Sequence, residues 1–103
     1  MAELRESEVI VDGVRSLLLE SGPADAAEAV VFVQGKPGSA YDWAALLAGV
    51  GEFARGIALD LPGFGRADKP ADFNYSIEGY LVHLTDAWKQ LGVERAHVVV
   101  HDF

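Results

Sequence analysis

The chain has 103 residues, of which half are hydrophobic, and 8 basic against 16 acidic side chains give a formal net charge of −8. This length allows one small domain with a modest core, and the acidic balance argues against nucleic acid or an anionic membrane as a partner, because both attract positive charge. The absence of cysteine excludes disulfides and thiolate metal sites. The charged first segment and the lack of an apolar run near the roughly 20 residues that cross a bilayer predict a cytoplasmic protein.

The first half of the sequence predicts a hairpin and a buried strand. Residues 8–11 and 15–20 are short apolar-rich runs on either side of Asp12-Gly13, a turn dipeptide, so we expect two antiparallel strands. Residues 29–33 form a continuous β-branched and aromatic run, which is typical of a strand buried on both faces. The run ends in the segment Gly35-Lys36-Pro37-Gly38, which favours neither helix nor strand.

A helix and a second strand follow. Asp42 is suited to cap a helix that starts at Trp43 and closes around Gly49 and Gly51. Three- and four-residue spacing predicts one apolar face made by Leu46, Leu47 and Val50. Residues 55–59 are then expected to be a second buried strand, followed by a sharp turn and a loop to residue 74.

A longer helix and a third strand complete the pattern. Ser76 is the expected N-cap of a helix over residues 77–91, and Gly92 is its expected C-terminal stop. Its predicted apolar face consists of Tyr80, Leu81, Leu84, Trp88 and Leu91. Residues 96–100 predict a third buried strand, and His101-Asp102-Phe103 follow it.

This order contains two strand–helix–strand units, which connect parallel strands, almost always through right-handed crossovers. We therefore expect the beginning of an open, mostly parallel α/β sheet. Ligands bind beyond the carboxyl ends of the strands in such sheets. Three segments are expected there: residues 34–41, residues 60–74 and residue 101 onward.

Several of these segments resemble the α/β-hydrolase family. Residues 33–38 resemble its His-Gly-x-Pro loop, and residues 60–70 (Asp-Leu-Pro-Gly-Phe-Gly-Arg-Ala-Asp-Lys-Pro) are close to its segment after the fourth strand. Tyr75-Ser76 fits the start of the next helix, and residues 98–103 resemble the fifth strand running into the nucleophile elbow. The resemblance implies the N-terminal part of an α/β-hydrolase sheet, with a hairpin and two strand–helix–strand units. Residues 1–103 would then be a partial domain that lacks the cap, later strands, acid and catalytic histidine.

The resemblance also implies a chemistry. Aspartate at the elbow marks the family's epoxide hydrolases and haloalkane dehalogenases, whereas esterases have serine in Gly-x-Ser-x-Gly. Asp102 is thereby the expected nucleophile, which attacks an sp³ carbon and forms an alkyl-enzyme ester that water hydrolyses. The backbone N–H groups of Lys36 and Phe103 are the expected oxyanion donors, and Gln34, Gly35 and Pro37 belong to the oxyanion loop.

Three departures from the family pattern bear on the substrate. Gln34 stands where the family usually has histidine, Lys36 where dehalogenases usually have asparagine, and Phe103 where they usually have tryptophan. A phenyl ring has no N–H to cradle a departing halide. An epoxide hydrolase-like reaction on a small neutral molecule, in the full-length form, is therefore favoured over dehalogenation. The histidines lack ligand spacing and no phosphate-binding glycine loop is present, so no metal or organic cofactor is implied.

Each candidate residue also has a simpler interpretation. Asp102 is in isolation an ordinary polar residue at a strand end or a helix N-cap, and the Gly35–Gly38 segment is also an ordinary turn. His101 is expected to be structural, His83 and His97 to lie on the surface, and Asp60 to order its loop by hydrogen bonds. Lys36 and Lys69 are solvated loop lysines or bind an anion. The large aromatic side chains are expected to be core or helix-packing residues: Trp43, Phe53, Tyr80 and Trp88.

Three hypotheses remain for the chain as a whole. It is a truncated α/β-hydrolase, a non-catalytic remnant or binding protein, or one half of a split hydrolase that docks a complementing chain. Strand 96–100 would present a free apolar edge. We therefore expect the isolated chain to be marginally stable, to self-associate through this edge, or to depend on a partner chain.

Overall fold

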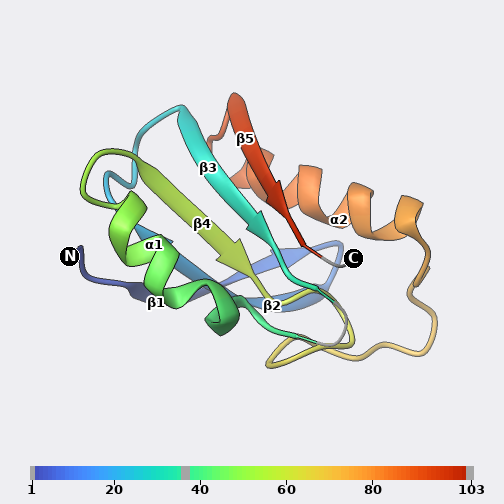
Figure 1. Cartoon of the computed structure of the whole chain (residues 1–103). Helices are drawn as coiled ribbons and strands as arrows, with labels where there is room; N and C mark the ends of the chain where they lie inside the picture. The colour runs from blue at the N-terminus through green and yellow to red at the C-terminus, as the bar shows by residue number, and fades with distance from the viewer. Residues whose placement is uncertain (1, 36–37, 102–103) are drawn as a thin grey trace.

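The computed structural model describes residues 2–35 and 38–101, and Figure 1 shows their arrangement. The described elements are, in chain order, β1 (Arg5–Val11), β2 (Val14–Ser21), β3 (Glu28–Val33), the 3₁₀ turn η1 (Ala40–Trp43), α1 (Ala44–Val50), β4 (Arg55–Leu59), α2 (Ile77–Gln90) and β5 (Arg95–Val100). The strands form one sheet in the order β1-β2-β4-β3-β5. No helix within the described ranges is long and apolar enough to cross a membrane.

The predicted hairpin is confirmed. β1 pairs antiparallel with β2, and Val11 lies opposite Val14. The two turn residues between them, Asp12 and Gly13, have φ of 51° and 80°. A two-residue turn whose twist matches that of the two strands requires positive φ at both positions. Asp-Gly is a dipeptide that adopts this conformation readily.

The centre of the sheet is parallel, as the strand–helix–strand pattern predicts. β3 lies between β4 and β5 and runs parallel to both, with Val31 opposite Ile57 on one side and Val98 on the other. β2 joins this parallel part antiparallel to β4. The fold is therefore a mixed α/β sheet with the hairpin and the two strand–helix–strand units that the sequence predicts.

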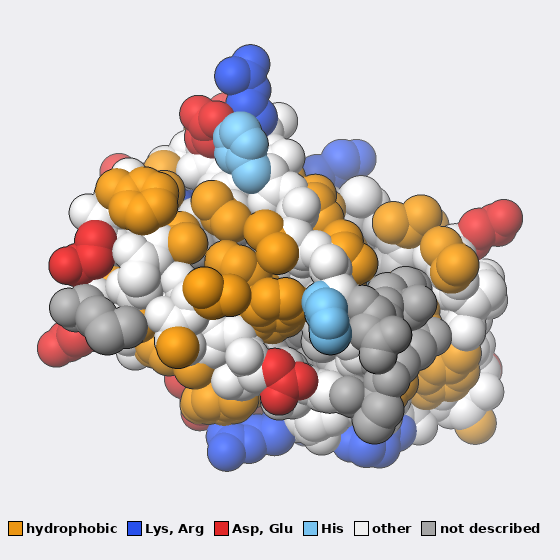
Figure 2. Space-filling view, in the orientation of Figure 1, with side chains coloured by type: hydrophobic (Ala, Val, Ile, Leu, Met, Phe, Trp, Pro, Cys, Tyr) orange, Lys and Arg blue, Asp and Glu red, His pale blue; other side chains and the backbone are white. Residues whose placement is uncertain are grey.

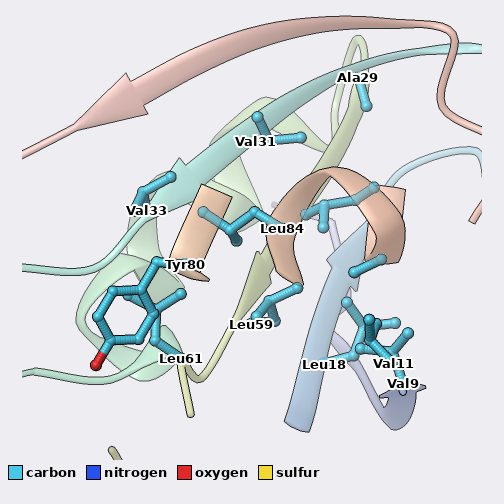
Figure 3. Close-up of a cluster of buried hydrophobic side chains, with 12 residues drawn as sticks. Val9, Val11, Leu18, Ala29, Val31, Val33, Leu59, Leu61, Tyr80 and Leu84 are labelled. Carbon is cyan, nitrogen blue, oxygen red and sulfur yellow. The ribbon is translucent and has the colours of Figure 1, made fainter. Parts of the chain in front are cut away.

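The two helices cover opposite faces of the sheet. α2 packs over the larger apolar cluster, where Tyr80 and Leu84 meet side chains of the strands (Figure 3). α1 packs over the smaller one through Leu47. Neighbouring residues of β4 divide between the clusters, since Ile57 belongs to the first and Ala58 to the second. Alternation along a strand thus explains why its whole length is buried.

The start of the first helix differs from the prediction. A 3₁₀ turn precedes the α-helix: Ser39 is the N-cap of η1 and Trp43 is the N-cap of α1, so Asp42 is the N-cap of neither. Asp42 lies inside that turn, and its carboxylate accepts the backbone N–H of Ser39 at 3.1 Å. Leu46 is 54% exposed while Leu47 is fully buried, so the predicted apolar face is wrong at Leu46.

α2 agrees with its prediction at both ends. The Ser76 hydroxyl accepts the N–H of Gly79, and Gly92 follows the helix with φ of 77°. The helix face is different from the predicted one, because Leu81 is 52% exposed. His83 is buried instead, which corrects its assignment to the surface. Tyr80, His83, Leu84 and Ala87 make the buried stripe at three- and four-residue spacing.

Two further burial predictions are wrong. Phe53 is 80% exposed in the turn before β4 and is not a core residue. β5, predicted as a buried strand, is exposed at every residue except Ala96, which is partly buried. It pairs with β3 on one edge, and α2 covers only part of its flank, so Val98 and Val100 remain about half exposed.

Candidate active site

The candidate site lies where the three parallel strands end. Gln34, Asp60 and His101 each follow directly on the last residue of β3, β4 and β5. Val33 is paired with Val100, so the chain leaves β3 and β5 at the same level of the sheet. In Figure 1 the arrowheads of β3, β4 and β5 point to this one end of the molecule, where the loops after β3 and β4 begin.

The Gln34 side chain connects the loops after β3 and β4. It is 1% exposed, and its Oε1 accepts the backbone N–H of Leu61 at 2.8 Å. Its Nε2 donates to the carbonyl of Gly38 at 2.6 Å and lies 3.3 Å from that of Gly35. A polar side chain placed at the end of a buried strand is thereby fully paired, as buried polar groups require.

The Asp60 carboxylate makes a second connection between the same loops. It is 1% exposed and accepts the N–H of Ala40 at 2.6 Å and that of Arg66 at 2.7 Å. Gly65 has φ of 51°, and a Cβ added there would lie 2.3 Å from the carboxylate, so only glycine fits. The expectation that Asp60 orders its loop by hydrogen bonds is confirmed.

The loop after β4 is also fastened to β2. The N–H of Asp60 bonds to the carbonyl of Leu17, and Asp68 exchanges backbone and carboxylate bonds with Arg15. The Tyr80 hydroxyl donates to the carbonyl of Pro62 at 3.3 Å. Lys69 donates to two carbonyls of its own loop, so its ammonium group serves the loop structure.

An exposed polar group borders these loops. Arg66 forms an ion pair with Glu6 at 3.4 Å and lies 5.7 Å above the ring of Tyr41. The Tyr41 hydroxyl donates to Glu6, and this bond raises the pKa of the tyrosine because it stabilises the protonated form. The group joins β1 to both loops.

Several predicted site residues lie outside the described residues, namely Lys36, Pro37, Asp102 and Phe103. Asp102 is the second residue after β5 in the sequence. His101 is exposed, and His97 lies at the opposite end of β5, where it bonds to Glu28 at 2.5 Å. Within residues 2–35 and 38–101, no group of three or more histidine or acidic side chains could hold a metal ion.

A buried pair of polar residues was not predicted from the sequence. Ser16 Oγ lies 3.1 Å from His83 Nε2, and both residues are at most 2% exposed. Burial lowers the pKa of His83, while the nearby Asp86 carboxylate acts in the opposite direction. The signal was present in the sequence, because His83 is spaced three from Tyr80 and four from Ala87 on the buried stripe.

The comparisons with known proteins agree with this geometry. The sequence model of the alpha/beta hydrolase fold matches residues 28–103. The chain is 36% identical over 95 residues to the mesoderm-specific transcript protein of Mus musculus, covering 88% of this chain and 28% of that protein. It is 35% identical over 101 residues to a haloalkane dehalogenase of Bradyrhizobium diazoefficiens, covering 98% and 31%.

The solved structures give the same result. An epoxide hydrolase from Vigna radiata superposes with a TM-score of 0.79 and 30% identity, and the match covers 97% of this chain and 32% of that one. The chain thus spans about a third of the length of these relatives. Its parallel strands, the loops at their carboxyl ends and the family match agree: the chain belongs to the α/β-hydrolase fold family.

Proposed function

We propose that this chain carries the nucleophile and the oxyanion loop of an epoxide hydrolase-like enzyme, with Asp102 as the nucleophile. The observation that carries the proposal is the register of β3 and β5, in which Val33 is paired with Val100. Because these strands are parallel and end at the same level, the sequence after each of them starts at the same edge. The oxyanion loop and the nucleophile must meet at such a place.

The order of events follows from the chemistry of a carboxylate. An Asp102 oxygen attacks a ring carbon of the epoxide, the ring C–O bond breaks, and the released oxygen takes a proton. Water then adds to the ester carbonyl, and the N–H groups of Lys36 and Phe103 stabilise the oxyanion that forms. The intermediate collapses to a diol and free Asp102. In this proposal the histidine that activates the water comes from sequence outside these 103 residues.

The choice of epoxide over haloalkane rests on Lys36 and Phe103. Relatives of this chain include a haloalkane dehalogenase and several epoxide hydrolases, so similarity alone does not separate the two reactions. Halide release needs side-chain N–H donors beside the leaving group, and a phenyl ring offers none. Opening an epoxide creates no free halide and does not need these donors.

The test begins with the DNA beyond the Phe103 codon, where an in-frame Gly-Gly and a later Gly-His support the proposal. The protein from the complete reading frame is then assayed with a small aryl epoxide and with a haloalkane. We expect epoxide hydrolysis, and a loss of about a thousandfold or more in Asp102→Ala. Asp72→Ala, which changes an exposed aspartate, is the matched control and should retain activity.

A single turnover in H₂¹⁸O identifies the intermediate. Because water attacks the ester carbonyl, the label should be found in the Asp102 carboxylate and not in the first equivalent of diol. Label in the diol alone would mean direct attack by water and would contradict the nucleophile assignment. Turnover of the haloalkane but not of the epoxide would overturn the choice of substrate.

The exposed flank of β5 favours a second proposal, in which the site is completed by a complementing polypeptide. Val33, Val98 and Val100 line an apolar groove of about 190 Å³ together with Ile77, Tyr80, Leu81, Leu84 and Trp88 of α2. Figure 2 shows more hydrophobic side chains gathered over the middle of the opposite face. Purification of the chain with a second polypeptide that restores hydrolysis would support this arrangement, and full activity of the pure chain would exclude it.

A further inference from the structure

We propose that Gln34 is a positioning residue that sets the spacing between the loops after β3 and β4. Its uncharged amide bonds to both loops, and we call this arrangement the Gln34 clamp. The inference deepens the proposed function, because the loop after β3 is the one that would hold the oxyanion donor. The clamp itself is a property of described residues and can be tested without any activity.

The clamp uses both ends of the amide. The oxygen accepts from Leu61 on the loop after β4, while the NH₂ group donates to Gly38 on the loop after β3. Only a side chain with a donor and an acceptor at this separation satisfies both partners. A hydrocarbon of the same size would leave a buried N–H and a buried carbonyl unpaired, which is costly.

The position of Gln34 in the sequence means that these hydrogen bonds affect the loop after β3. Its donor contacts, Gly35 and Gly38, stand on either side of residues 36–37 in the sequence. The Asp60 carboxylate holds the continuation of the same loop at Ala40. The two side chains therefore fix this loop at both of its ends against the loop after β4.

An amide keeps its donor and its acceptor throughout the pH range in which carboxylic acids and imidazoles change charge. Replacement by a titrating group should make the clamp pH-dependent in a direction that depends on the group. In Gln34→Glu the carboxylate has no hydrogen to offer Gly38, and protonation at low pH restores one. In Gln34→His the neutral ring can donate and accept, and protonation at low pH removes the acceptor for Leu61.

The first experiment measures amide hydrogen exchange of Leu61 and Ala40 in the 103-residue chain between pH 4.5 and 8, expressed as protection relative to the unfolded chain. Amides of the β3–β4 ladder report global unfolding and are measured in parallel. The matched control is Gln90→Glu, since the Gln90 amide also donates to a backbone carbonyl, that of Ile10 at 2.8 Å, on the exposed end of α2.

The wild-type protection of Leu61, taken relative to the β3–β4 ladder amides, should be constant with pH. In Gln34→Glu it should be about tenfold lower at pH 7.5, the loss that corresponds to one hydrogen bond, and recover toward pH 4.5. In Gln34→His it should be near the wild-type value at pH 8 and fall as the pH is lowered. Equal, pH-independent protection in both variants and in the control would overturn the clamp.

The second experiment measures kcat and KM of the protein from the complete reading frame. The ratio of variant to wild-type kcat should follow the same opposite pH trends, with recovery at low pH for Gln34→Glu and at high pH for Gln34→His. Exchange trends without matching kcat trends would show that the clamp does not position the reaction. If the wild type hydrolyses no epoxide, the proposed function fails while the exchange experiment still decides the clamp.

Discussion

The loops at the strand ends and the flank of β5 lie close together but satisfy their chemistry in opposite ways. At the loops, the polar groups of Gln34 and Asp60 are 1% exposed and paired within the chain. At the flank, Val98 and Val100 are apolar and 51% and 55% exposed. The hydrogen bonds within the chain therefore stabilise the loops, whereas the exposed apolar surface of the flank costs free energy in water until something covers it.

This difference separates two requirements of the proposed enzyme. The support for the proposed oxyanion loop is present within these residues, because the Gln34 and Asp60 side chains already have their partners. The surface beside β5 exposes Val98 and Val100, whose side chains have no polar group to bond to the loops. Substitutions in one region at a time show whether the other region responds.

The largest effect is expected from Asp60→Ala. The substitution leaves the buried N–H of Ala40 and the N–H of Arg66 without their acceptor, and it should lower the free energy of unfolding by about 3 kcal/mol. Asp60→Asn keeps one acceptor and should cost about half as much. Urea denaturation followed by circular dichroism measures both. Asp72→Ala, at an exposed position, should change stability by less than about 0.5 kcal/mol, and an equal loss in all three variants would contradict the contrast.

A smaller effect is expected from pH, through His83. Burial holds the pKa of His83 below its unfolded value near 6.5, so the unfolded chain binds its proton more readily than the folded chain does. The stabilisation is therefore complete above about pH 6.5 and is lost as the pH falls from there through the folded pKa. Urea midpoints at pH 7.5 and 5.0 measure it.

The comparison variant for that measurement is His83→Gln, which keeps a polar partner for Ser16 and cannot take up the proton. It should show a smaller loss of stability between pH 7.5 and 5.0 than the wild type. His101→Gln, at an exposed position, is the control and should keep the wild-type loss. Identical losses in the wild type and in His83→Gln would refute the assignment.

The smallest effect on folding, and the largest on association, is expected at the β5 flank. Val98→Thr keeps a β-branched side chain and makes an exposed position polar, so stability should change by less than about 0.5 kcal/mol. Sedimentation velocity should show less self-association of the 103-residue chain. Val82→Thr, on α2 and 60% exposed, is the control, and the same reduction in both would mean that the β5 flank has no special role.

The sequence was sufficient for the features that depend on neighbouring residues. The Asp12-Gly13 turn, the Ser76 cap and the strand at Arg55–Leu59 agree with prediction, because backbone conformation, capping and hydrophobic runs are local properties. The resemblance to α/β-hydrolases also depended on short segments in order and agrees with the family match. The roles predicted for Asp102, Lys36 and Phe103 stay predictions, because those residues lie outside the described part.

Only the tertiary structure decided which side chains are covered and which loops are joined. Leu81 and His83 fit a helical pattern equally well, but the packing of α2 on the sheet buries the histidine and exposes the leucine. β5 has the composition of a buried strand and is exposed because its neighbours cover only one edge and part of one face. The Gln34 amide finds one partner four residues away, at Gly38, and the other 27 residues away, at Leu61. Local sequence determines the conformation of a segment, whereas burial and long-range pairing depend on what the fold brings beside it.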